Sequence, residues 1–213
     1  LPCVIASIIA AEFATGVGLN PETFPVARIP QLSLESGLKM AVIAAGCGLL
    51  SILFCVALKA VSGIYGKYLK NPYLRVCVAG CLVIGITMLL GTGDYMGAGN
   101  ELIAKAVEQG KARPLDFLWK MILTAITMRA GYRGGEIVPA FSVGFGCVAG
   151  GLLGFSPEVA AAASMVALFC GVTNCPIASM LISFELFGFS GAAYYLIAIS
   201  ISYALSGYYS LYK

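Results

Sequence analysis

The segment GYRGGEIVPAFSVGFG, residues 131–146, joins a glycine-rich turn to the start of an apolar helix. Proline is favoured in the first turn of a helix, because its missing N–H would have no partner there. Pro139 therefore predicts where the helix begins. Gly134 and Gly135 let the backbone turn sharply and carry no Cβ that would keep a ligand away.

The chemistry that this turn offers is anion binding by the backbone. The N–H groups of Glu136, Ile137 and Val138 have no acceptor within the helix, and that of Gly135 lies beside them. In a bilayer these groups need another acceptor, and an anion suits them because the helix dipole also favours negative charge. The alternative is an ordinary helix start in a polar loop, capped by Glu136 or by water.

A second turn follows the same pattern in CGVTNCPIASMLISFELFG, residues 170–188. Pro176 opens another apolar helix, and Thr173 or Asn174 is predicted to cap it. Two helices interrupted by glycine or proline within a short span are typical of transporters with discontinuous helices.

The composition requires a membrane. The 213 residues are 60% hydrophobic and 11% charged, whereas soluble domains carry about 25% charged residues. Between residues 137 and 212 the only charged side chains are Glu158 and Glu185. The sequence therefore predicts a polytopic protein of the cell membrane, all-α in fold class.

The sequence lacks the residues that other classes of function would require. There is no histidine, and the acids are scattered, which argues against a membrane-embedded enzyme and leaves no candidate catalytic residue. Eight cysteines without a CxxC pair argue against a zinc site or any other metal site. A net charge of +3 without a basic, aromatic-rich patch gives no case for nucleic acid, and no cofactor is implied.

Apolar runs predict helices that differ in length. The runs cover about 3–19, 38–60, 75–91, 115–129, 137–154, 159–171, 176–188 and 191–206. Several are shorter than the roughly 20 residues that cross a bilayer, so we expect tilted and broken helices that stop partway. The basic loop between residues 59 and 75 predicts a cytoplasmic side. The polar segment 93–116 predicts a connector with a short amphipathic helix.

Three motifs resemble the CLC family of chloride channels and chloride/proton antiporters. GGEIVP (134–139) is similar to the family's GxFxP anion-binding motif, GTGDYMGAGNELI (91–103) to its upstream glycine-rich segment, and NCPIASMLISFELF (174–187) to its "RAPLTGIILVLE" segment. Their order and spacing agree from about residue 38 to 206. The resemblance covers the C-terminal half of the family's membrane domain.

The resemblance implies a fold, an activity and partners. Residues 1–213 would form one half of an inverted-repeat CLC-type transporter as a single domain, with the N-terminal half absent. The whole protein would be a homodimer that moves chloride or a similar small anion across the bilayer, either passively or coupled to proton counter-transport. The alternatives are a fluoride/proton antiporter of the same family and a different carrier with discontinuous helices.

The resemblance also assigns residues. The backbone amides of residues 135–138 would contact the central anion, although the family usually has an aromatic residue where Ile137 stands. The Glu136 carboxylate would repel an anion, so we expect it to turn away, toward Arg133. Glu22 lies where antiporters of the family place a proton-transfer glutamate. The alternative for Glu22 is a solvated loop acid.

Three further positions remain candidates. Glu12 is an intramembrane carboxylate, and such residues are functional candidates by default. Glu185 ends an apolar helix and is expected to accept hydrogen bonds from backbone amides. The family's late, anion-contacting tyrosine has no secure match among Tyr208, Tyr209 and Tyr212.

Overall fold

All regular secondary structure in the described part of the chain is helical. The computed structural model describes residues 2–19, 23–24, 26, 29–91, 99–108, 110, 112–113, 115–132 and 139–207. Its elements in chain order are α1 (Pro2–Gly16), α2 (Leu34–Tyr68), α3 (Pro72–Leu90), α4 (Asn100–Glu108), α5 (Asp116–Ala130), α6 (Pro139–Leu152), α7 (Pro157–Thr173), α8 (Pro176–Phe187), the 3-10 turn η1 (Phe189–Gly191) and α9 (Ala192–Ser206).

These helices confirm the expected elements and correct some of their ends. Each predicted apolar run lies on one helix, and the polar connector contains the amphipathic α4. The helix expected at 38–60 is longer at both ends, and a capping box explains its earlier start. The Ser33 hydroxyl accepts from the N–H of Ser36, and the Ser33 N–H donates to the Ser36 hydroxyl.

The helices fall into long and short classes, as the sequence indicated. Three are long and apolar enough to cross a membrane among the described residues, namely Leu34–Tyr68, Pro72–Leu90 and Phe189–Ser206. The shorter apolar helices are Ile5–Gly16, Val143–Leu152, Pro157–Thr173 and Pro176–Phe187. A helix of 10–17 residues spans about 15–26 Å, which is less than the ~30 Å hydrocarbon core.

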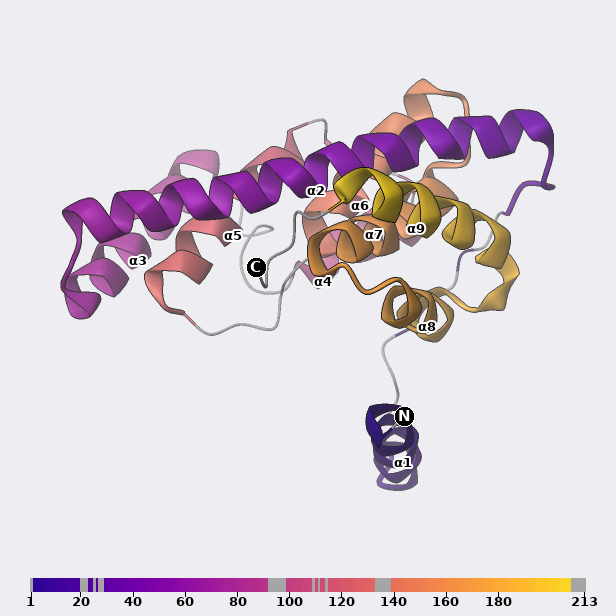
Figure 1. Cartoon of the computed structure of the whole chain (residues 1–213), viewed down its shortest axis with the longest axis horizontal. Coiled ribbons are helices and arrows are strands. Elements are labelled where there is room, and N and C mark those ends of the chain that lie inside the picture. The colour runs from indigo at the N-terminus through magenta and orange to yellow at the C-terminus, as the bar shows by residue number, and fades with distance from the viewer. Residues whose placement is uncertain are drawn as a thin grey trace.

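Helix α7 is the centre of the packing. It is buried along almost its whole length, and residues 159–163 are fully enclosed. Helices α2, α4, α6, α8 and α9 all pack against it. Figure 1 shows α4, α6, α7 and α9 along one half of the long α2, with α3 and α5 along the other half and α1 apart from this bundle.

Glycines allow α6 and α7 to approach closely. A Cβ added at Gly146 would collide with the Ala160 carbonyl and the Ser164 side chain, and one added at Gly150 would collide with the Ala160 methyl group. Gly146 and Gly150 therefore serve the packing of α6 against α7. Gly151 does not, because an added Cβ there would meet nothing within 4 Å.

This difference predicts opposite effects of one substitution at two positions of α6. Gly146→Ala should destabilise the protein by about 1–3 kcal/mol, because the new methyl group overpacks the contact with α7. Gly151→Ala should leave stability unchanged or raise it by up to about 1 kcal/mol, because alanine favours the helix and the space is open. Thermal unfolding of the two variants of the intact protein in detergent measures both. Equal midpoints for the two would contradict the packing described.

Candidate functional site

The predicted anion-binding turn lies between two described helix ends. Residues 135–138 are outside the described residues, as are Glu22, Arg133 and the tyrosines at 208, 209 and 212. On one side α5 ends at Ala130, followed by Gly131 in the left-handed region (φ 112°). On the other side the described part of α6 begins at Pro139.

The end of α5 is held by two bonds to α3. The Arg75 Nε–H donates to the Ala130 carbonyl over 3.0 Å, and the Tyr132 hydroxyl donates to the Val76 carbonyl over 3.1 Å. A cation at the C-terminus of a helix is favourable, because it meets the negative end of the dipole and an unpaired carbonyl. Arg75 therefore fixes the chain just before the glycine-rich turn.

A third bond joins the same end of α5 to α2. The Tyr65 hydroxyl donates to the Ile126 carbonyl over 3.3 Å. Sequence reasoning missed Arg75, Tyr65 and Tyr132. Arg75 looked like one more basic loop residue, and no local signal links it to a carbonyl 55 positions away.

The α6–α7 pair is antiparallel, and its register places the start of α6. Gly146 faces Ser164. Pro139 lies seven residues before Gly146 on α6, and Gly171 lies seven residues after Ser164 on α7. Because the two helices are antiparallel, Pro139 and Gly171 lie at nearly the same height along the pair. Gly171 is three residues before Asn174, where the second predicted turn begins. The two proline-started helices α6 and α8 therefore begin at the same end of α7.

The end of α9 lies at this place as well. The Asn174 amide Nδ2 donates to the Gly207 carbonyl over 3.3 Å, and the Ser202 hydroxyl donates to the Ala167 carbonyl over 2.7 Å. Gly207 directly precedes the segment that contains the candidate tyrosines. The structure thus brings together the starts of α6 and α8 and the ends of α7 and α9.

The capping prediction for α8 is wrong. The N-cap residue is Cys175, and no side-chain hydrogen bond caps the helix. Asn174 adopts φ 60° and ends α7 instead, and its N–H donates to the Cys170 carbonyl. The Thr173 hydroxyl donates back into α7, to the Phe169 carbonyl. The Thr173 hydroxyl and the Asn174 backbone N–H serve the helix that ends there, and the Asn174 side chain bonds to Gly207. The first-turn amides of α8 are left without a side-chain cap.

The two other acidic candidates are exposed. Glu185 lies on the surface of α8 and makes no hydrogen bond or ion pair among the described residues, so its expected role as an acceptor for backbone amides is not found. Glu12 is exposed on α1. The described residues contain no cluster of His, Cys, Asp or Glu that could hold a metal ion.

Known proteins are similar to this chain in sequence and in fold. A chloride/fluoride channel protein of Pseudomonas syringae pv. tomato is 30% identical over 99% of this chain and 48% of its own length. The crystal structure of a CLC-type fluoride/proton antiporter is 27% identical and superposes with a TM-score of 0.93 over 99% of this chain and 54% of that one. The chain spans about half the length of the relatives it matches.

The family itself follows from nearly the whole sequence. Residues 1–207 match the model of the family described as voltage gated chloride channel. The resemblance seen in the three motifs is thereby confirmed, together with the all-helical fold. The chain belongs to this family of multi-pass membrane channels and transporters, whose members are not enzymes.

Proposed function

We propose that the intact protein carries chloride or a similar small anion across the cell membrane and binds it with the backbone amides of residues 135–138. The observation that carries this proposal is the shared starting level of α6 and α8 at one end of α7. These residues would form the C-terminal half of the membrane domain, and the whole protein would be a homodimer, as the family resemblance implies.

The physical support is electrostatic. Each helix start carries the equivalent of roughly half a positive charge, together with N–H groups that lack acceptors within the helix. Within the bilayer core no water satisfies such groups, so irregular backbone is tolerated only where it lines a cavity or is buried in protein. Two such starts at one level, without a side-chain cap on α8, favour an anion as the missing acceptor.

Fluoride with proton exchange is the second candidate. Fluoride occurs in the names of both relatives described above, and one of them is a fluoride/proton antiporter. Under this alternative Glu22 would carry the proton. The amide site is the same in both cases, because backbone N–H groups can donate hydrogen bonds to either halide.

Transport by the reconstituted protein tests the proposal. The intact protein is placed in vesicles loaded with chloride or with fluoride, and efflux is followed with an ion-selective electrode while a pH electrode records proton movement. We expect efflux of at least one of the two anions. Proton movement that depends on the anion gradient would indicate antiport, and the absence of flux for every halide would overturn the proposed function.

Two substitutions in the turn separate amide from side-chain binding. Glu136→Gln should leave anion affinity within a few-fold, because the carboxylate is expected to point away from the anion. Gly135→Val should weaken binding strongly, because a β-branched side chain restricts the turn. Isothermal titration with chloride and fluoride measures both variants. A large loss of affinity in Glu136→Gln alone would contradict the assignment.

A third substitution tests the hydrogen bond that holds the end of α5 just before the turn. Arg75→Met removes a hydrogen bond from a charged donor, which is worth about 1.5–3 kcal/mol. We expect faster hydrogen exchange in the last turn of α5 and weaker anion binding in the same variant. Lys39→Met, at the other end of α2, is the control and should change neither. Unchanged exchange in Arg75→Met would show that this bond does not hold the helix end.

A further inference from the structure

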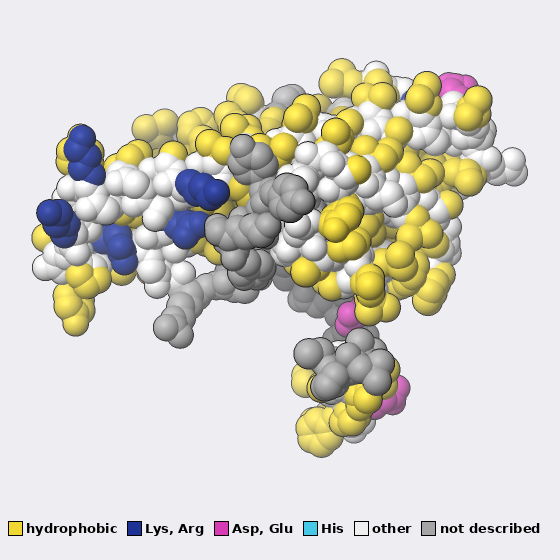
Figure 2. All heavy atoms as spheres, viewed as in Figure 1, with side chains coloured by type: hydrophobic (Ala, Val, Ile, Leu, Met, Phe, Trp, Pro, Cys, Tyr) yellow, Lys and Arg dark blue, Asp and Glu magenta, His cyan; other side chains and the backbone are white. Residues whose placement is uncertain are grey.

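Positive charge gathers at the end of the molecule where α2 meets α3. Lys67 and Lys70 are exposed there, and neither forms an ion pair with a described residue. No Asp or Glu occurs between residues 36 and 91. Figure 2 shows Lys and Arg side chains concentrated at this end, while the Asp and Glu side chains visible in this view lie elsewhere. We call Lys67, Lys70 and the turn between them the basic corner.

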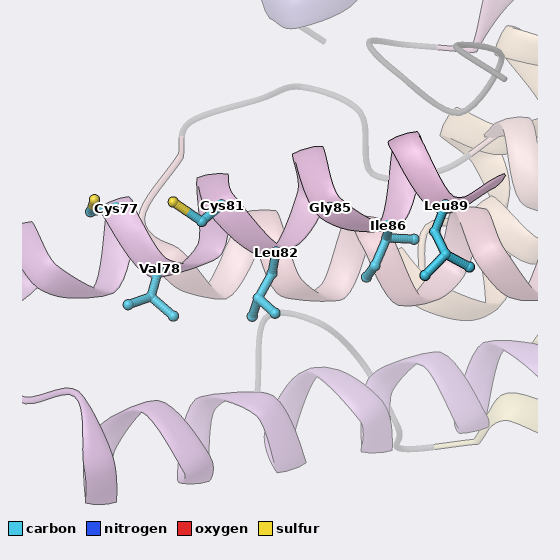
Figure 3. Close-up of a pocket in the computed structure, with 7 residues that line it drawn as sticks. All are labelled: Cys77, Val78, Cys81, Leu82, Gly85, Ile86 and Leu89. Carbon is cyan, nitrogen blue, oxygen red and sulfur yellow. The ribbon is translucent and has the colours of Figure 1, made fainter. Parts of the chain in front are cut away.

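A groove runs along α3 away from the basic corner. It has a volume of about 420 Å³ and lies between two rows of side chains on the exposed face of the helix (Figure 3). Gly85 widens it, because a Cβ there would meet nothing within 4 Å. The lining consists of Cys77, Val78, Cys81, Leu82, Ile86 and Leu89 around Gly85.

The length of this groove matches one leaflet of a bilayer. From residue 77 to residue 89 the helix rises about 18 Å, and half of the ~30 Å hydrocarbon core is about 15 Å. The groove begins seven positions after Lys70, about 10 Å along the chain if all of it were helical. An extended lysine side chain reaches over much of that distance.

Aromatic side chains mark the level of the membrane surface, with Tyr68 inside the basic corner and Tyr73 between the corner and the groove. Tyr68 is 72% exposed and Tyr73 is 85% exposed, and tyrosine is enriched where the hydrocarbon core meets the headgroups. The Lys67 ammonium lies 5.4 Å from the centre of the Tyr68 ring. The order along the surface is therefore cation, aromatic ring, apolar groove, which is the order of headgroup, interface and acyl chain in a phospholipid.

We propose that the basic corner and the α3 groove together form a binding site for an anionic phospholipid. Lys67 and Lys70 bind the headgroup phosphate, and one acyl chain lies in the groove. A free phosphate ion would leave the apolar groove unused, and a zwitterionic lipid would gain less from two lysines without an acid nearby. The proposal does not depend on the proposed transport.

Lipid selectivity of the intact protein tests the headgroup half of the site. The protein is reconstituted in phosphatidylcholine vesicles with trace spin-labelled phosphatidylglycerol or phosphatidylcholine, and the motionally restricted fraction of each label gives its relative affinity. The double variant Lys67→Gln/Lys70→Gln should lower the preference for phosphatidylglycerol at this site by roughly fivefold for each lysine. Lys39→Gln, at the other end of α2, is the matched control and should leave the preference unchanged.

Filling the groove tests the acyl-chain half. Gly85→Leu should reduce the restricted fraction of phosphatidylglycerol while the unfolding temperature stays close to that of the parent, because the added side chain enters open space. Gly63→Leu on α2, where an added Cβ also meets nothing within 4 Å, is the control.

Two outcomes would overturn the proposal. One is a preference for phosphatidylglycerol that survives the double lysine substitution. The other is a Gly85→Leu variant with unchanged lipid restriction and a lower unfolding temperature, which would mean that protein rather than lipid covers the groove.

Discussion

The close approach of α6 and α7 is the contact on which the candidate site depends. Gly146 and Gly150 let the two helices touch through backbone and small side chains, so their register is set by shape. In lipid there is little hydrophobic force between helices, and packing of small residues takes its place. Because the pair is antiparallel, this register also decides that α6 starts where α7 ends. A looser contact would leave the helix starts free to shift along each other.

Helix α7 connects this contact to the other helices of the bundle. It is enclosed by α2, α4, α6, α8 and α9, and its alanine-rich surface lets all of them approach. Asn174 ends the helix in a left-handed conformation and ties the turn to Gly207. The start of α8 and the end of α9 are thereby held by the same residue. The unpaired amides of two helices can then face one volume, which a single short helix could not achieve.

The second support of the candidate site is a set of hydrogen bonds from residues that are distant in the sequence. Arg75 on α3 and Tyr65 on α2 hold the last turn of α5, and Tyr132 returns a bond to α3. The cation at a helix C-terminus offsets the negative end of that dipole close to where an anion is expected. Positive charge at this end of the protein therefore has two uses. Arg75 holds the end of α5, and Lys67 and Lys70 belong to the proposed lipid site at the membrane surface.

The sequence by itself determined the helices, the proline-marked starts of α6 and α8, and the family, since apolar runs, Gly-Pro signals and motif spacing are local properties. The anion-binding role of residues 135–138 and the proton-transfer role of Glu22 remain predictions of the sequence. Only the tertiary structure decided that Asn174 ends α7 rather than capping α8, that Arg75 bonds to Ala130, and that Glu185 is exposed. These features depend on which distant residues meet, and a hydrogen bond across 33 or 55 positions leaves no local pattern.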